Sequence, residues 1–140
     1  MDLPRIPIDD FQARCHHLWD SRWLLLTAGD LASGDFNMMT VAWGSFGTMW
    51  RRPFAQIVVR PTRHTYGFTE RHDTFTLCAF PEACRPILKV LGTRSGRDID
   101  KVHASGLTPV PADAVAAPAY AEAELVVACR KIYRDDLRPT

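Results

Sequence analysis

The sequence predicts a mainly β fold, an antiparallel β-barrel with a few peripheral helices. First, short apolar runs bounded by turn residues outnumber the segments with helical periodicity, which is typical of barrels. Second, the sequence lacks a glycine-rich turn of the GxGxxG or GxxxxGK type, which many doubly wound parallel sheets, the main alternative, carry. Third, 140 residues suit a single domain with a buried core.

Five strands are expected where leucine, β-branched and aromatic residues gather between turn signals. The expected strands are residues 23–30, 37–43, 54–60, 74–80 and 120–133. Pro61 ends the third strand because proline cannot donate to a strand ladder. The Ala/Pro-rich segment 108–120 is expected to be an extended surface connection before the last strand.

Four helices are expected around these strands, at residues 9–19, 62–71, 82–91 and 95–106. In the first, Phe11, Cys15, Leu18 and Trp19 recur at three- and four-residue spacing, as on one face of an amphipathic helix. Pro86 restricts the third helix to a late start or a kink. Gly106 is expected to close the fourth, since glycine readily ends helices.

Composition and charge exclude several classes of protein. With 17 basic and 16 acidic residues the net charge is +1, so neither a broad cationic face nor a nucleic-acid partner is expected. No apolar run is long enough to span a bilayer, and the proline-broken N-terminus lacks the form of a signal peptide, so a cytoplasmic protein is expected. The four cysteines show no CxxC spacing, and no metal site is expected.

The strand-to-helix junction at residues 60–65 predicts an anion site. The first N–H groups of a helix lack intrahelical partners and carry partial positive charge. Arg60 and Arg63 add guanidinium groups, and Thr62 and Thr65 add hydroxyls, a donor set suited to phosphate. The alternative is a helix capped by Thr62 with solvated arginines.

A second helix start is expected within TRSGRDIDK, residues 93–101. Ser95 and Asp98 match an S-x-x-D capping box, and Gly96 lets another group approach the backbone closely. Three cations cluster here: Arg94, Arg97 and Lys101. The alternative is a capped surface helix whose aspartates, Asp98 and Asp100, pair with these cations. One phosphorylated ligand could draw on both predicted anion sites.

The stretch FNMMTVAWGSFGTMW, residues 36–50, has an unusual composition for plain core. Core strands favour Val and Ile, whereas this one carries the polar Asn37 and Thr40 on either side of Met38 and Met39. Methionine is flexible and polarizable, so the pair could pack adaptably beside a flat ring. Core packing is the alternative for each methionine.

Four blocks in order resemble one known family: DFNMMTVAWGSFGTMWRRPFAQIVVRPTRHTYGF, FTLCAFPE, GTRSGRDIDKVHASGLT and AEAELVVACRKIYRDDL. The sequence is similar to the flavin reductase-like proteins of the FMN-binding split-barrel superfamily, and more narrowly to its small flavin reductase and flavoredoxin branch. The resemblance covers residues 23–137 and implies a single flavin reductase-like domain over residues 1–140. Members of this branch usually run further, which implies an additional C-terminal segment.

The resemblance implies a split β-barrel that forms a homodimer and binds FMN near the subunit interface. The residues it places along the isoalloxazine are Asn37, Met38, Met39 and Thr40. Those it places on the phosphate and ribityl chain are Arg60, Arg63 and Thr65. Those it places on the phosphate side are Ser95, Gly96 and Lys101. No catalytic side chain is expected, because FMN supplies the redox chemistry.

The implied activity is that of an NAD(P)H-dependent flavin reductase. NADH or NADPH would pass hydride to FMN, and the electrons would continue to a small-molecule or protein acceptor. The alternative within the family is a flavoredoxin-like electron carrier without its own NAD(P)H activity. A third hypothesis is a barrel that has lost flavin and serves only in binding or assembly.

Overall fold

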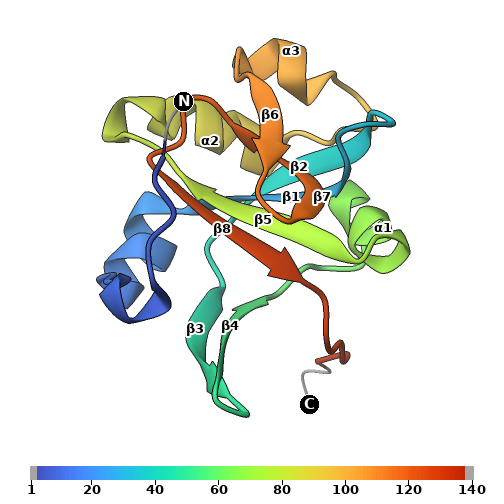
Figure 1. Ribbon diagram of the computed structural model, residues 1–140. Helices are drawn as coiled ribbons and strands as arrows, with labels where there is room; N and C mark the ends of the chain where they lie inside the picture. Colours follow the sequence, from blue (N-terminus) through green and yellow to red (C-terminus); the bar gives the residue numbers. More distant parts are fainter. Residues whose placement is uncertain (1–2, 138–140) are drawn as a thin grey trace.

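The computed structural model describes residues 3–137 and is mainly antiparallel β, with helices around the strands (Figure 1). Its central sheet has four strands in the order β2–β1–β5–β8, and every neighbouring pair is antiparallel. These strands are β1 Leu24–Asp30, β2 Asp35–Val41, β5 Thr74–Ala79 and β8 Leu125–Arg130. The predicted mainly β fold with peripheral helices is confirmed.

Two hairpins complete the β structure: β3 Gly44–Met49 with β4 Arg52–Ile57, and β6 Pro109–Ala112 with β7 Val115–Tyr120. The β3–β4 hairpin extends away from the sheet at the bottom of Figure 1. In contrast, β7 packs on the sheet, where the Thr76 hydroxyl donates to the Pro118 carbonyl (2.6 Å). The Thr27 and Tyr120 hydroxyls also share a buried hydrogen bond of 2.9 Å. These bonds fix β7 against β1 and β5.

The main helices are α1 His64–Arg71, α2 Arg85–Thr93 and α3 Lys101–Ser105. Shorter helical turns are η1 Ile8–Asp10, η2 His17–Arg22 and η3 Glu82–Cys84. Both α1 and α2 pack against β2, which lies at the edge of the sheet, and α3 packs on α2. Within residues 3–137, no helix is long and apolar enough to cross a membrane.

The sheet carries an apolar cluster on each face, because side chains alternate between the two faces of a strand. One cluster includes Leu25, Met38, Leu88, Leu91 and Tyr120. The other includes Trp19, Leu24, Leu26, Met39 and Leu77. Met38 and Met39 therefore lie on opposite faces. Each large buried side chain contributes about 1.5–3 kcal/mol, so both faces hold the edge strand β2 in place.

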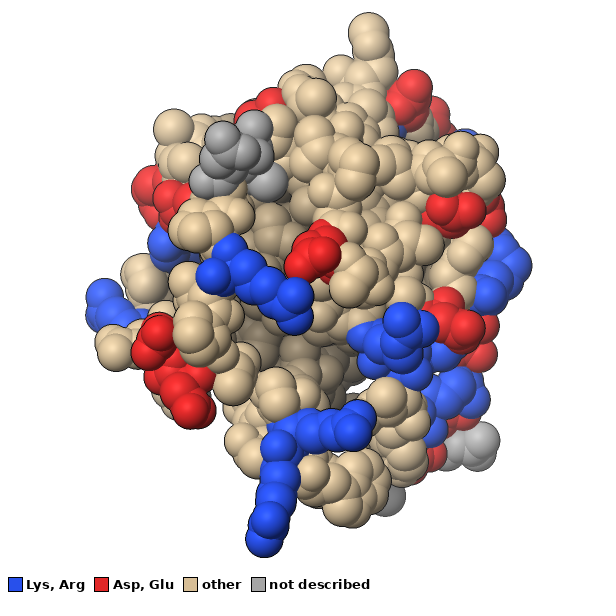
Figure 2. Space-filling view, viewed as in Figure 1, with Lys and Arg blue, Asp and Glu red and all other residues tan. Residues whose placement is uncertain are grey.

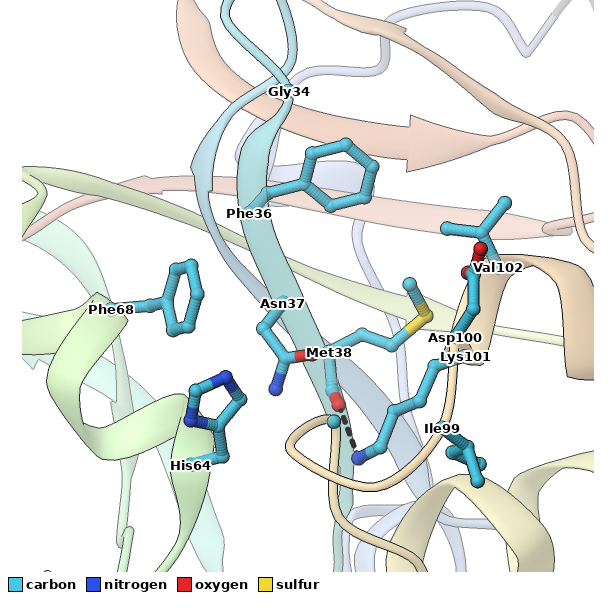
Figure 3. Close-up of a pocket in the computed structure, with 11 residues that line it drawn as sticks. Gly34, Phe36, Asn37, Met38, His64, Phe68, Ile99, Asp100, Lys101 and Val102 are labelled. Atoms are coloured by element: carbon cyan, nitrogen blue, oxygen red, sulfur yellow. Dashed lines mark hydrogen bonds between the residues drawn. The ribbon is translucent and has the colours of Figure 1, made fainter.

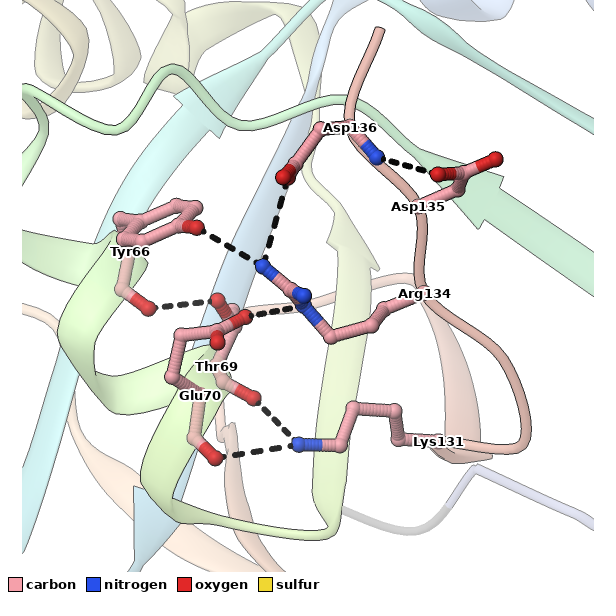
Figure 4. Close-up of polar contacts among 7 residues, drawn as sticks. All are labelled: Tyr66, Thr69, Glu70, Lys131, Arg134, Asp135 and Asp136. Atoms are coloured by element: carbon pink, nitrogen blue, oxygen red, sulfur yellow. Dashed lines mark hydrogen bonds and ion pairs between the residues drawn. The ribbon is translucent and has the colours of Figure 1, made fainter.

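The chain that follows β8 is tied to the C-terminal end of α1 (Figure 4). The Lys131 ammonium donates to the Thr69 carbonyl (2.8 Å) and to the Glu70 carbonyl (3.2 Å), at the helix end where a cation is favoured. Arg134 pairs with the Glu70 carboxylate (2.8 Å) and donates to the Tyr66 hydroxyl (3.0 Å). The guanidinium of Arg134 is therefore bound by side chains of α1 and of the C-terminal tail.

Two predictions for the C-terminal third are wrong. The segment 108–120 is not a surface connection: it forms β6–β7, and Ala117 and Tyr120 have no exposed surface. The small alanine side chains allow β7 to pack closely on the sheet, which composition alone does not indicate. The strand expected over residues 120–133 begins only at Leu125, because the chain first makes a turn.

β3 lies outside the expected strands, in a segment rich in glycine. A Cβ atom at Gly44 would lie 2.4 Å from the Trp19 ring, and one at Gly47 would lie 2.8 Å from the Phe54 ring. These glycines make room for aromatic rings, so the segment can pair with β4 as a strand. A two-residue turn at Trp50 and Arg51, both with positive φ, joins β3 to β4.

The helix expected over residues 9–19 is replaced by η1 and η2. The Phe11 and Trp19 rings both contact the Phe46 ring of β3, at centroid distances of 5.5 and 5.3 Å. They pack on the hairpin and do not form one helical stripe. The late start of the third helix is confirmed, because Pro86 lies in the first turn of α2.

Candidate functional site

The two predicted anion sites meet in space. They form one hollow of about 260 Å³, here called the arginine hollow, lined by Thr62, Arg63, His64, Thr93, Arg94, Ser95 and Arg97. The Arg97 guanidinium donates to the Thr62 carbonyl (3.4 Å). The Arg63 guanidinium donates to the Gly92 carbonyl (3.0 Å), at the end of α2. Each arginine thus spans from one segment to the other.

Neither predicted cap forms. α1 begins at His64 after Arg63, and no side chain caps it, so Thr62 is not an N-cap. The Ser95 hydroxyl accepts from the Arg97 N–H (3.1 Å) within a turn. α3 begins only at Lys101, so the helix start predicted at Ser95 is wrong. The hydroxyl of Ser95 is therefore used within a local turn, and Ser95 lies on the wall of the hollow.

A second cavity, of about 240 Å³, lies beside β2 and is here called the edge cavity (Figure 3). Phe36, Met38 and Phe68 give it apolar walls, and Asn37, His64, Gly96 and Lys101 also line it. His64 borders both hollows. An apolar-walled cavity next to a hollow rich in guanidinium groups suits a ligand with a ring and an anionic group.

Lys101 is buried, with 4% of its surface exposed. Its ammonium donates to the Met38 carbonyl (2.7 Å) and the Leu91 carbonyl (2.9 Å), so it ties α3 to β2 and α2. It lines the edge cavity and not the arginine hollow. Burial, together with the charge of Arg63, lowers the pKa of Lys101 to about 8.

This pKa predicts a pH dependence of folding stability. The folded value of about 8 lies below the ordinary value of 10.5, so the unfolded chain binds more protons and stability rises as pH rises between these values. Lys101→Met removes the titration. We expect the free energy of unfolding of the wild type, relative to this variant, to rise by about 2 kcal/mol between pH 7.5 and 9.5.

Urea denaturation at the two pH values measures the difference. Lys131→Met is the matched control for loss of a lysine that donates to two carbonyls, since Lys131 makes such contacts but is not buried. An equal effect of Lys101→Met at both pH values would contradict the prediction.

Asn37 joins three segments at the edge of the sheet. Its amide nitrogen donates to the Thr65 hydroxyl (2.8 Å), and both side chains are buried. Its amide oxygen lies against Gly96, where a Cβ atom would come within 2.4 Å of it. A larger residue at position 96 would displace the Asn37 amide, so Asn37 and Gly96 together set how closely the 94–97 loop approaches β2.

The other predicted site residues of β2 are occupied with packing. Met38 and Met39 are buried on opposite faces of the sheet, and the Thr40 hydroxyl donates to the Leu88 carbonyl (2.5 Å) beneath α2. The Met38 carbonyl points out of the sheet, toward Lys101. Backbone N–H and C=O groups of one residue point the same way in an antiparallel strand, so the Met38 N–H also points outward.

Arg60 is not brought to either hollow. Its guanidinium lies 5.0 Å from the centroid of the Trp43 ring, a cation–π contact. Thr93 was missed by sequence reasoning, because a threonine at the end of a helix carries no signal of its own. His64, Arg94 and Arg97 stood inside the predicted anion segments and join the hollow through the fold.

Charge is mixed on the face shown in Figure 2, where Lys and Arg side chains are interspersed with Asp and Glu. Among the residues that the structure describes, no three His, Cys, Asp or Glu side chains gather in a way that could hold a metal ion.

The model of the flavin reductase like domain family matches residues 21–136. The chain belongs to this family. Flavoredoxin of Desulfovibrio vulgaris (Miyazaki F) is similar in structure, at 25% identity over 85% of this chain and 64% of that chain, with a TM-score of 0.74. The FMN-binding domain of a flavin reductases-like enzyme from Shewanella baltica OS155 is similar at 20% identity over 86% and 62%, with a TM-score of 0.72.

Flavoredoxin from Methanosarcina acetivorans is also similar, at 20% identity over 98% of this chain and 68% of that chain, with a TM-score of 0.73. No curated protein matches the chain in sequence. The chain spans slightly less than two thirds of the D. vulgaris and S. baltica proteins. The predicted family and its split-barrel fold are confirmed.

The residues present fit the FMN that this family implies. Three arginines, together with Thr62 and Ser95, line one hollow, and guanidinium and hydroxyl donors suit a phosphate. Thr93 also lines it, but its hydroxyl donates to the Lys89 carbonyl (2.8 Å). Gly96 leaves room for the Asn37 amide, which a Cβ atom there would meet at 2.4 Å. The fit to FMN therefore rests on the donor chemistry of the arginine hollow.

Proposed function

We propose that the chain binds FMN and acts as an NAD(P)H-dependent flavin reductase. The observation that carries the proposal is the meeting of two arginine-bearing segments, distant in sequence, in one hollow beside the edge strand. Membership of a flavin reductase-like family supports the choice of ligand.

Each part of the site has a role in this proposal. Arg63, Arg94 and Arg97 hold the phosphate by charge-assisted hydrogen bonds. The outward N–H of Met38 donates to a polar edge of the ring. Asn37 keeps the 94–97 loop against β2, so that these donors stay in place. When bound, FMN supplies the hydride and electron transfer, and the protein supplies orientation and charge.

Anaerobic mixing of FMN-loaded protein with NADH or NADPH tests the activity. We expect either donor to bleach the flavin absorbance band within the time of manual mixing, at a rate that rises with protein concentration at fixed free FMN. Bleaching no faster than that of free FMN under the same conditions would contradict the reductase proposal.

A flavoredoxin-like electron carrier is the second candidate. The similarity to flavoredoxin of D. vulgaris, at 25% identity, favours it. A carrier would bind FMN, resist reduction by NADH and NADPH, and bleach with a reduced protein donor, so the same experiment separates the two functions. A barrel without flavin would remain colourless on titration with FMN.

The homodimer and the cytoplasmic location stay predictions. Exposed large apolar side chains are consistent with a partner surface, and in the described part of the chain they include Met49, Trp50, Ile132, Tyr133 and Leu137. Trp50 lies at the tip of the β3–β4 hairpin with 81% of its surface exposed. A second copy that covers this surface would remove it from water.

A further inference from the structure

His64 stands at the boundary between the arginine hollow and the edge cavity. Its ring meets the Phe68 ring edge-on at 5.1 Å, and its Cδ2 atom would lie 3.0 Å from a Cβ atom at Gly96. Figure 3 shows the ring turned toward Asn37, across the cavity from Lys101. Among residues 3–137, no hydrogen bond to a ring nitrogen of His64 is found, and the ring lines both hollows.

The charged groups that face His64 are almost all cationic. They are Arg97 and Lys101 from the neighbouring segment, Arg71 from α1, and Arg63 and Arg94 on the wall of the hollow. Arg71 is paired with the Asp35 carboxylate of β2 (3.6 Å). One acidic residue, Asp100, lies on the cavity wall. Its carboxylate caps α3 by accepting a hydrogen bond from the backbone N–H of His103 (3.1 Å). Burial, then Arg97, Lys101 and Arg71, lower the pKa of His64 below its ordinary value.

We propose that His64 is a proton-coupled ligand of the arginine hollow. When a dianion such as a phosphoryl group enters, His64 takes up a proton from water and donates a hydrogen bond to the anion as an imidazolium. The inference rests on the proposed function only in taking that phosphoryl group to be the phosphate of FMN. It adds a fourth cation to the three arginines, present only in the complex.

The physical reason is the balance of charge around the ring. Without an anion, the surrounding cations and partial burial favour the neutral imidazole. A dianion between these cations cancels their repulsion and attracts the imidazolium directly, so the pKa of His64 rises on binding. Thermodynamic linkage then requires that lower pH strengthens binding of the anion through His64.

Proton NMR of the protein tests the proposal directly. The C2 proton of His64 is assigned by its loss in His64→Gln, or in His64→Tyr, which keeps a ring against Phe68. Its titration is followed with and without sulfate at matched ionic strength, because sulfate remains a dianion throughout. We expect sulfate to raise the midpoint by about one pH unit, a tenfold change in proton affinity.

Calorimetry with FMN gives an independent measurement. FMN is titrated at pH 6.5 into wild type and His64→Gln in two buffers of different ionisation enthalpy. The wild type should take up more protons per FMN than the variant, and the difference removes protons exchanged by the flavin phosphate itself.

The outcomes separate the two proposals. If FMN fails to bind, the proposed function falls, and the sulfate titration still decides the role of His64. If FMN binds, but sulfate leaves the His64 midpoint unchanged and both proteins exchange equal numbers of protons, the inference is overturned and the proposed function stands.

Discussion

Gly29→Ala should lower the free energy of unfolding by about 3–4 kcal/mol. Gly29 has φ +132°, and a Cβ atom there would lie 2.2 Å from the Asp35 carbonyl oxygen and 2.5 Å from the Phe36 Cα atom. Both of these atoms belong to backbone, so no side-chain rotation relieves the clash. The pairing of Gly29 with Phe36 between β1 and β2 must therefore open. This loosens the start of the edge strand β2.

Gly34→Ala provides a matched control in the same hairpin. Gly34 also has positive φ, +78°, but a Cβ atom there would meet nothing within 4 Å. Gly34→Ala should lower the free energy of unfolding only by the cost of a left-handed backbone at an alanine, about 1 kcal/mol. Urea denaturation of the two variants measures the difference. Equal losses of stability would show that the close approach at Gly29 does not hold the hairpin.

The parts of the fold that sequence could predict are those with a strong local pattern. β1 and β5 are continuous apolar or β-branched runs, and the structure places both in the middle of the sheet. β7 lacks such a pattern: Ala117, Pro118 and Ala119 are buried because the sheet lies beneath them, whereas Ala116 is exposed. Burial of small residues depends on the tertiary partner, which a local window of sequence does not contain.

The site shows the same limit at the level of single cations. Arg60 and Arg63 stand three positions apart in one motif, yet Arg63 lines the hollow and Arg60 stacks on Trp43. Lys101 belongs to the second cationic cluster, yet its ammonium is used by two backbone carbonyls. Charge clusters in sequence indicate where an anion could bind, but the backbone decides which cations remain available.

Alternation along β2 also divides the NMMT block. Met38 and Met39 belong to different apolar clusters, so their side chains cannot both line one face of a ring. What the block offers in common is its position at the free edge of the sheet, with Asn37 holding α1 and the 94–97 loop against it. We expect the backbone of this strand to matter to ligand binding more than its methionine side chains.

Removal of two guanidinium groups from the arginine hollow should have the largest effect on FMN binding. A charge-assisted hydrogen bond contributes about 1.5–3 kcal/mol, and about 1.4 kcal/mol corresponds to a factor of ten. The variant Arg63→Ala/Arg97→Ala should therefore bind FMN about 100-fold more weakly, or worse. Quenching of flavin fluorescence on titration measures the dissociation constant.

Two controls separate a phosphate contact from a general loss of charge or structure. Arg52→Ala/Arg130→Ala removes two exposed arginines that line neither hollow, and should leave FMN affinity within about twofold, since exposed charges far from a site are screened. Arg134 is unsuitable for this purpose because it is bound to Glu70 and Tyr66. Riboflavin lacks the phosphate, so its affinity should be the same for the wild type and the hollow variant. A parallel loss of riboflavin binding would mean that Arg63 and Arg97 act by holding α1 and the end of α2 together, and the assignment of the phosphate to this hollow would be withdrawn.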